Sequence, residues 1–304
     1  MNTAPILLFV YNRPAHTRRV LEALSRNALA AESDLFVYSD AARSEADRAA
    51  VTETRRMIRQ ARGFRQIHLT ERPQNLGLAG NIIDGVTTII NQYGRVIVLE
   101  DDLVVAPHFL QFMNDALEAF KDEPQVGHIH ACEFTHDPSL PETFLIRWTG
   151  SWGWATWKQA WKYFNPDGKA LLRELEERKL TRQFDFDGSY GYTRMLRRQI
   201  EGKNHSWAIR WNASLFLNGI LSFNAGRSLV QNIGFDGSGT NCGKEDLYAT
   251  PLWTERIRID KNIPIHENIL ARKAMSDYYR RTNSFKSKAI RRLKQEFSRL
   301  WKIK

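Results

Sequence analysis

The chain has 304 residues, of which 42% are hydrophobic, and it contains 16 Phe, 9 Tyr and 9 Trp. This apolar content can fill a sizeable core and excludes a mainly disordered protein, while the length suits one large α/β domain or two unequal lobes. The formal net charge of +10 is typical of nucleic-acid or membrane binding, but eight Lys/Arg and one acid fall within residues 285–304, so the body of the protein is close to neutral.

The N-terminal segment and the cysteines favour a cytoplasmic protein. The apolar run at residues 4–10 has no basic leader before it and reads as a first strand, so we expect no signal peptide. No stretch of 18 apolar residues occurs, and we therefore expect no membrane-spanning helix. Two cysteines, Cys132 and Cys242, are too few for a disulfide framework or a zinc site, and a reducing compartment suits them.

Strand and helix patterns alternate through the first half of the sequence. Apolar runs predict strands at residues 6–10, 35–38, 67–69 and 95–99, and amphipathic patterns predict helices at residues 15–30, 45–62 and 78–92. Continuous apolar strands between amphipathic helices predict a mostly parallel sheet covered by helices on both faces. The second half is rich in Trp, Gly and Asn, and its predicted helices are at residues 157–164, 169–182 and 192–201.

Polar residues follow three of the predicted strands, at the sheet edge where ligands of parallel sheets bind. They are Asn12-Arg13, Ser39-Asp40 and Glu100-Asp101-Asp102. Three adjacent carboxylates repel one another, so this acidic triplet is costly unless a cation neutralises it. Carboxylate oxygens suit Mg²⁺ or Mn²⁺, which take further ligands from substrate phosphates and can neutralise a diphosphate leaving group. The alternative is a solvated acidic loop before the next helix, but the position at a strand end favours the metal site.

The segment around this triplet, residues 99–109, resembles the metal-binding segment of N-acetylglucosaminyltransferase I and its relatives, which are inverting, metal-dependent glycosyltransferases of the GT-A fold. Further segments resemble parts of these enzymes or of the family-2 glycosyltransferases, namely residues 5–13, 39–40, 75–81, 153–154, 209–211 and 228–235. The resemblance implies a Rossmann-like α/β domain. Its nucleotide-sugar-binding half would span residues 1–135, a Trp-rich acceptor-side half residues 136–270, and a basic tail residues 271–304.

The resemblance also implies roles for individual residues. Asp102 would coordinate the metal, and Glu100 and Asp101 would contact the ribose and metal-bound waters. The residues that would contact the nucleotide sugar elsewhere are Arg13 along the nucleotide, Asp40 at the uracil ring and Asn81 in the 75–81 loop. This chain has Tyr-Asn-Arg at residues 11–13 where the relative has a Cys-Asp-Arg type of sequence, and this departure bears on which base is bound.

Inversion requires a carboxylate that takes the proton of the acceptor hydroxyl. By the resemblance it lies between the Gly-Trp element at residues 153–154 and a late strand expected at 209–211. The first candidate is Asp187, which Gly188 leaves accessible in a turn, and the second is Asp185. The alternative is that both acids cap the helix around residues 192–200. Glu245-Asp246 is a third candidate, although a surface loop suits this pair better.

The tryptophans near residue 154 have two interpretations. Trp152 and Trp154 could stack on a sugar ring, whereas Trp157 and Trp161 are expected to pack in the core.

The tail at residues 285–304 combines an apolar stripe at helical spacing with basic residues on the remaining surface. A basic amphipathic helix of this kind is typical of binding to an anionic membrane surface, and docking on the protein body is the alternative. The continuous apolar face argues against a nucleic-acid-binding arm.

The sequence therefore predicts a metal-dependent inverting glycosyltransferase, a hexosyltransferase or N-acetylhexosaminyltransferase using Mn²⁺ or Mg²⁺. Its donor would be a nucleotide-diphosphate sugar, with UDP favoured, and its acceptor a saccharide or lipid-linked glycan in polysaccharide or lipopolysaccharide synthesis. It would be cytoplasmic, peripheral on the inner face of the plasma membrane through its tail. One alternative is a sugar nucleotidyltransferase, against which the absence of glycine from the first loop counts. The other is a non-catalytic, membrane-associated carbohydrate-binding protein.

Overall fold

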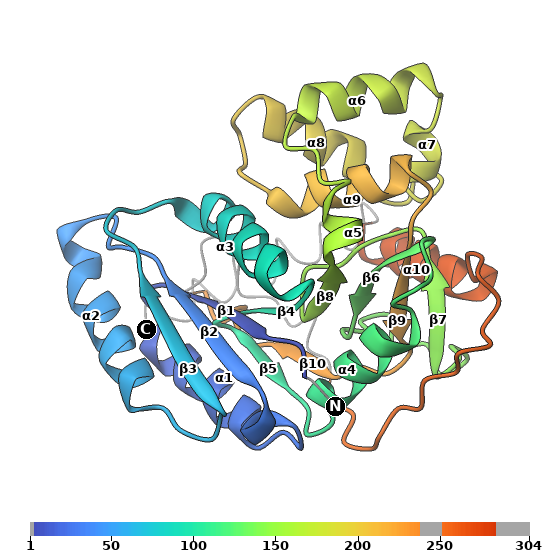
Figure 1. Cartoon of the computed structure of the whole chain (residues 1–304). Helices are drawn as coiled ribbons and strands as arrows, with labels where there is room; N and C mark the ends of the chain where they lie inside the picture. Colours follow the sequence, from blue (N-terminus) through green and yellow to red (C-terminus); the bar gives the residue numbers. More distant parts are fainter. Residues whose placement is uncertain (1–2, 238–250, 284–304) are drawn as a thin grey trace, which may run out of the picture.

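The computed structural model describes residues 3–237 and 251–283 of the chain (Figure 1). The strands are β1 (Ile6–Val10), β2 (Asp34–Ser39), β3 (Gln66–Glu71), β4 (Arg95–Glu100), β5 (Leu103–Val105), β6 (Val126–His130), β7 (Thr143–Ile146), β8 (Trp154–Trp157), β9 (Leu221–Ala225) and β10 (Val230–Asn232). The helices are α1 (Pro14–Ser25), the short 3-10 helix η1 (Ala30–Glu32), α2 (Glu45–Gln60), α3 (Gly77–Tyr93), α4 (Phe109–Ala119), α5 (Lys158–Trp161), α6 (Gly168–Glu177), α7 (Thr181–Phe184), α8 (Tyr192–Ile200), α9 (Trp207–Leu217) and α10 (Ile269–Asn283). Cys242, Glu245-Asp246 and the amphipathic tail at 285–304 lie outside the described residues.

One mixed sheet organises the described part of the chain. Its eight strands have the order β3-β2-β1-β4-β8-β6-β9-β7, and β5 pairs with β10 in a separate antiparallel ribbon. The first four strands are parallel, and β8 runs antiparallel between β4 and β6. The predicted α/β architecture with a mostly parallel sheet is therefore confirmed. Because β2 and β3 extend from one side of β1 and β4 pairs on its other side, the chain reverses direction across the sheet between β1 and β4.

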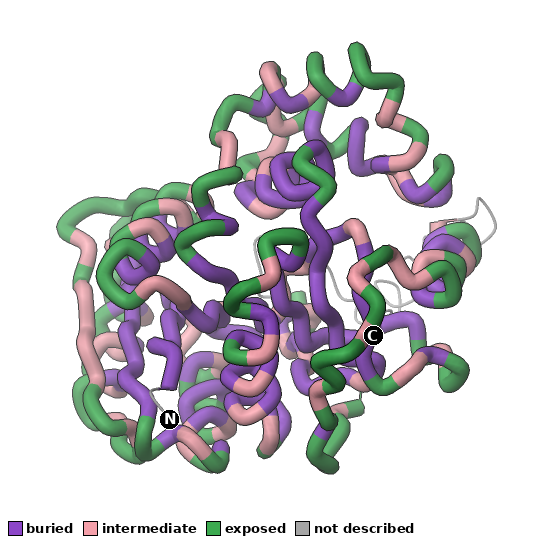
Figure 2. The backbone as a smooth tube through the Cα atoms, turned by 45° about the vertical axis from the view of Figure 1, so that its right-hand side comes forward, coloured by how far each residue is buried: buried purple, intermediate pink, exposed green. Residues whose placement is uncertain are grey.

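The central strands β1, β2 and β4 are buried on both faces, as their continuous apolar sequences require, whereas the edge strand β3 is only partly buried. Ile6, Leu8 and Val10 of β1 face a core shared with α1, α2 and α4. Leu7 and Phe9 face the opposite core, which α3, α5 and α9 cover. Figure 2 shows the result, with the central strands buried and the outer surfaces of the covering helices exposed.

A third apolar cluster lies among the helices of the second half. It is formed by residues of α6, α7, α8, α9 and α10 together with β7, and includes Leu171, Leu196, Phe216, Met275 and Phe144. Figure 1 shows α6, α7 and α8 grouped above the sheet, with α10 beside β7. None of the described helices is long and apolar enough to cross a membrane.

Three predictions for the second half were wrong in type or bounds. Residues 209–211 are not a strand, because they lie within α9, whose N-cap Ser206 accepts a hydrogen bond from the backbone N–H of Ile209. The helix expected at 157–164 is instead the last residue of β8 followed by the short α5. The helix expected at 169–182 is broken between α6 and α7, where Lys179 adopts a left-handed φ of 54°.

Candidate functional site

The carboxyl ends of β1 and β4 bring three of the predicted site residues together. Arg13 follows β1, and its Nη2 lies 2.9 Å from Oδ2 of Asp102 and also contacts Oδ1 of Asp101. The backbone N–H of Tyr11 donates to Oδ2 of Asp101 over 3.3 Å. In an open α/β sheet, ligands bind where the strand order reverses, and this cluster lies at that point.

Part of the negative charge of this cluster is offset within the chain itself. Burial would lower the pKa of Arg13, but Asp101 and Asp102 outweigh this effect and raise it, so the guanidinium stays charged. Burial raises the pKa of Asp101, and Arg13 opposes that shift. Burial, together with the negative charges of Asp102 and Asp101, raises the pKa of Glu100 to about 8. The surroundings therefore disfavour the charged form of Glu100, in keeping with the repulsion among three adjacent carboxylates.

Asp40, which follows β2, is fixed by the loop that precedes α3. Its Oδ1 accepts hydrogen bonds from the backbone N–H groups of Leu76, at 2.9 Å, and of Ala41, at 3.0 Å. Its Oδ2 accepts from the N–H of Gly77 at 3.0 Å. The side chain is only 5% exposed. Asp40 thus anchors the start of α3, a role that the sequence did not reveal.

Hydrogen bonds also join the loops that follow β1, β2 and β3. The Tyr11 hydroxyl accepts from the backbone N–H of Arg43, and Nδ2 of Asn12 donates to Asp47. The guanidinium of Arg55, on α2, donates to the carbonyl oxygens at the strand ends, which belong to Ser39, Asp40 and Arg72. These hydrogen bonds join the three loops into one connected surface beside Arg13.

Asn81, on α3, is buried beside these loops. It is 2% exposed, and its Oδ1 accepts a hydrogen bond from Nε of Arg72 at 3.0 Å. The guanidinium of Arg72 lies over the ring of Tyr38, 4.8 Å from its centroid. Asn81 therefore positions Arg72, and Arg72 is a residue that the sequence did not single out.

The segment after β10 closes against Asp102. The backbone N–H of Ile233 donates to the carbonyl oxygen of Asp102 at 2.8 Å. Gly234 lies so close that a Cβ there would be 2.3 Å from Oδ2 of Asp102. Nε2 of His16, on α1, lies 3.2 Å from Asp236, which fixes the segment to the other side of the site. The absence of a side chain at Gly234 was not recognised as a requirement from the sequence, because it depends on a contact 132 positions away in the chain.

The donor set suits a divalent cation that is shared with a ligand. Within the described residues, no three His, Cys, Asp or Glu side chains converge on one point. Asp101 and Asp102 nevertheless present adjacent carboxylate oxygens, and Mg²⁺ in particular is bound by one or two carboxylates together with water and substrate phosphates. These two residues fit a metal bound with a diphosphate better than a site made by protein ligands alone.

The two tryptophans considered for sugar stacking have different environments. Trp154 is part of β8 at the centre of the sheet, is 1% exposed and stacks on Trp207 at 5.1 Å. Its assignment to a sugar platform is therefore wrong, because no ring face is accessible. Trp152 is partly exposed and contacts Phe235 edge-on at 5.6 Å, beside the segment that closes on Asp102. Trp157 and Trp161 are buried, as expected.

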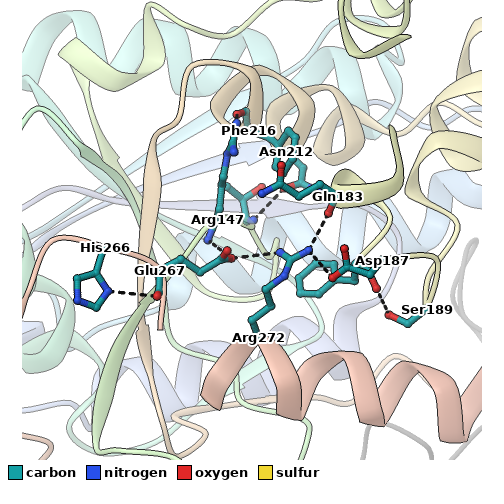
Figure 3. A network of polar contacts seen from close by, with 11 residues as sticks. Arg147, Gln183, Asp187, Ser189, Asn212, Phe216, His266, Glu267 and Arg272 are labelled. Atoms are coloured by element: carbon teal, nitrogen blue, oxygen red, sulfur yellow. Dashed lines mark hydrogen bonds and ion pairs between the residues drawn. The ribbon is translucent and has the colours of Figure 1, made fainter. Parts of the chain in front are cut away.

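Of the two candidate bases, Asp187 lies in a separate polar network with Arg272 and Glu267 (Figure 3), whereas Asp185 bonds at the start of α8. Asp185 accepts a hydrogen bond from the backbone N–H of Thr193 at 2.6 Å and so caps α8, as the alternative interpretation held. Asp187 lies 3.0 Å from Nη2 of Arg272 on α10, and Arg272 also lies 3.3 Å from Glu267. Asp185 and Asp187 therefore bond to residues of the second half of the chain and not to the cluster of Arg13, Asp101 and Asp102.

No family model and no curated protein sequence matches this chain. Several solved structures overlap with part of it. S. aureus TarS is 15% identical over 52% of this chain and 29% of its own, with a TM-score of 0.35, so the overlap spans less than a third of TarS. The mannosyltransferase PcManGT from Pyrobaculum calidifontis, solved with GDP-Man and Mn²⁺, is 10% identical over 71% of this chain and 69% of its own, with a TM-score of 0.41. The galactosyltransferase LgtC, solved with donor and acceptor sugar analogs, is 11% identical over 71% and 72%, with a TM-score of 0.39. These overlaps are distant.

Proposed function

We propose that this protein is a glycosyltransferase that uses a nucleotide-diphosphate sugar and a divalent cation. One observation carries the proposal: two buried carboxylates, Asp101 and Asp102, contact a partly buried arginine, Arg13, at the point where the strand order reverses. Such a site offers both anionic ligands for a metal and a cationic donor for a phosphate. The resemblance of residues 99–109 to the metal-binding segment of inverting transferases supports the same assignment.

Each residue of the site has a separate proposed role. Asp102, with Asp101 beside it, would hold Mn²⁺ or Mg²⁺, which when bound neutralises the diphosphate leaving group. Arg13 would donate to the diphosphate, since a guanidinium fits phosphate oxygens in a bidentate manner. The segment at Ile233 and Gly234 would keep water away from this side of the site, because it packs directly on Asp102.

The joined loops after β1, β2 and β3 would form the nucleotide pocket, and we propose a uridine nucleotide as its occupant. Oδ2 of Asp40 accepts one hydrogen bond in the structure, so it retains capacity for a second donor such as the ring N–H of uracil. A saccharide acceptor would approach from the side of Trp152 and Phe235.

The base for inversion is proposed as Asp187. Its side chain is 48% exposed and is held by Arg272, whereas Asp185 is committed to the cap of α8. The proposal therefore requires that the acceptor hydroxyl reach Asp187 during the reaction. Binding of residues 285–304 to an anionic membrane on the cytoplasmic side would place the enzyme near a lipid-linked glycan.

A nucleotide panel tests the proposal. UDP, GDP, CMP and dTDP are each added with Mn²⁺ or with a chelator, and the melting temperature is followed, since a ligand of the folded state raises it by mass action. We expect a metal-dependent shift with UDP that is lost in Asp102→Asn. The shift should be kept in Asp122→Asn, which changes an exposed acid between α4 and β6. A shift with another nucleotide would correct the base assignment. The absence of any shift in folded protein would refute the transferase proposal.

A further inference from the structure

Two carboxylate oxygens that could bind a metal at this site are already in contact with a side chain of the protein. A single nitrogen of Arg13, Nη2, contacts both Asp101 and Asp102, at 2.9 Å for the second. The three side chains are 18%, 6% and 10% exposed, so their charges are largely removed from water. Charged groups in such surroundings interact strongly and are poorly screened.

A metal ion and the guanidinium cannot share these oxygens. Nη2 already contacts Oδ2 of Asp102 and Oδ1 of Asp101, so a metal that took these two oxygens would compete with it for them. Two cations that close together repel each other in a poorly solvated site. A metal that binds these two oxygens would therefore displace Arg13 from them.

The backbone of Arg13 is fixed, so only its side chain can move. Its carbonyl oxygen accepts hydrogen bonds from both the N–H and the Oγ1 of Thr17, each at 3.0 Å, and it forms the first turn of α1. Because the backbone is fixed, the guanidinium stays near the same sheet edge in any rotamer of the side chain. A diphosphate at that edge is a new partner for it, because arginine binds phosphate oxygens in a bidentate manner.

We propose that Arg13 is an exchangeable counter-ion, which pairs with Asp101 and Asp102 in the free protein and moves to the diphosphate when metal and nucleotide bind together. The inference rests on the proposed function. This exchange couples the affinity for the metal to the affinity for the nucleotide. Without nucleotide, Arg13 competes with the metal for the carboxylates, and with nucleotide bound, Arg13 has the diphosphate as another partner. By linkage, each ligand raises the affinity for the other by the same factor.

The test measures Mn²⁺ affinity without nucleotide, from the electron paramagnetic resonance signal of free Mn²⁺, in four proteins. These are the native chain, Arg13→Gln, Arg13→Lys and the control Arg19→Gln, which removes the same charge from an exposed position on α1. We expect Arg13→Gln to bind Mn²⁺ at least tenfold more tightly than the native chain, because its competitor is gone. Arg19→Gln should match the native chain.

The same titrations are repeated with saturating UDP. In the native chain UDP should strengthen Mn²⁺ binding, and in Arg13→Gln this strengthening should be at least tenfold smaller. Arg13→Gln leaves two buried carboxylates without their partner, so folding is checked by circular dichroism. If this variant does not fold, Arg13→Lys decides: its ammonium is a single point charge on a shorter reach, and we expect Mn²⁺ affinity above that of the native chain.

Two negative results have different meanings. If the native chain binds Mn²⁺ and UDP but the Arg13 variants bind Mn²⁺ no more tightly, the exchange is wrong and the proposed function stands. If the native chain and all variants bind neither ligand, the proposed function itself is refuted, and the exchange with it.

Discussion

Replacing Gly234 with alanine tests whether the segment after β10 shapes the site. The added Cβ would lie 2.3 Å from Oδ2 of Asp102 and 3.1 Å from Oδ1 of Asn232, whereas ordinary contacts begin at 3.4 Å. Either the carboxylate or the segment must therefore move by about 1 Å, judged from the overlap that close-packed atoms tolerate. Overpacking of this kind costs about 1–3 kcal/mol of stability. A displacement of about 1 Å at reacting groups can lower activity by roughly 100-fold.

The assay combines urea unfolding with calorimetric titration of UDP in the presence of Mn²⁺. Gly234→Ala should lose stability in the range above and bind UDP with Mn²⁺ at least tenfold more weakly. The control is Gly191→Ala at the start of α8, where a Cβ would meet only ordinary contacts at 3.5 Å or more and binding should not change. If Gly234→Ala binds and unfolds as the native chain does, the segment does not constrain Asp102 and this part of the account is wrong.

Three further predictions concern stability and burial. Burial lowers the pKa of His130 to about 4, so below pH 6.5 the unfolded chain binds a proton there that the folded chain does not. The free energy of unfolding should therefore fall by ~3 kcal/mol between pH 6.5 and 4. Urea unfolding of the native chain and of His130→Asn at several pH values checks this, and equal pH slopes for the two proteins would contradict it. Asp40→Ala should cost about 1–3 kcal/mol, because it leaves the N–H groups before α3 without their acceptor; an unchanged urea midpoint would show that the anchor is dispensable. Trp154→Ala should cost about 3–5 kcal/mol and Trp152→Ala clearly less, as their burial requires; equal melting temperatures of the two variants would contradict the burial argument.

The first half of the fold could be predicted because its strands and helices differ clearly in pattern. Apolar runs such as residues 6–10 and 95–99 became β1 and β4, and the amphipathic stretch at 45–62 became α2 at Glu45–Gln60. Helix ends were less certain, since α1 stops at Ser25, five residues before the predicted end. Short-range patterns fix the type of an element better than its bounds.

The second half was harder because its apolar segments lack a distinctive period. Residues 207–217 are almost entirely buried, and a segment that is apolar on all sides does not distinguish a buried helix from a strand. Trp154 was similarly ambiguous, since whether a tryptophan lies in a core or on a surface depends on its neighbours in the sheet, here β4 and β6.

The candidate site was predicted in its residue types but not in its contacts. The position of Asp101-Asp102 after a strand indicated an anionic site, and that placement is what the structure shows. That Arg13 would reach both carboxylates, and that Gly234 would pack on one of them, depends on distances across the fold that no local pattern contains. Asp185 illustrates the converse, because its role as a cap follows from residues within eight positions of it.

The central claim is that the site at Asp101 and Asp102 supports transfer of a sugar from a nucleotide diphosphate. The most direct measurement is product analysis by mass spectrometry after incubation of the protein with UDP-sugars and Mn²⁺, with and without pyrophosphate, for the native chain, Asp102→Asn and the control Asp122→Asn. We expect slow release of UDP by the native chain and by Asp122→Asn. In Asp102→Asn this release should fall by roughly 100-fold or more, because a metal ligand beside the leaving group is removed. Formation of UTP only when pyrophosphate is added would instead identify a nucleotidyltransferase, and intact donors in every sample would contradict the claim.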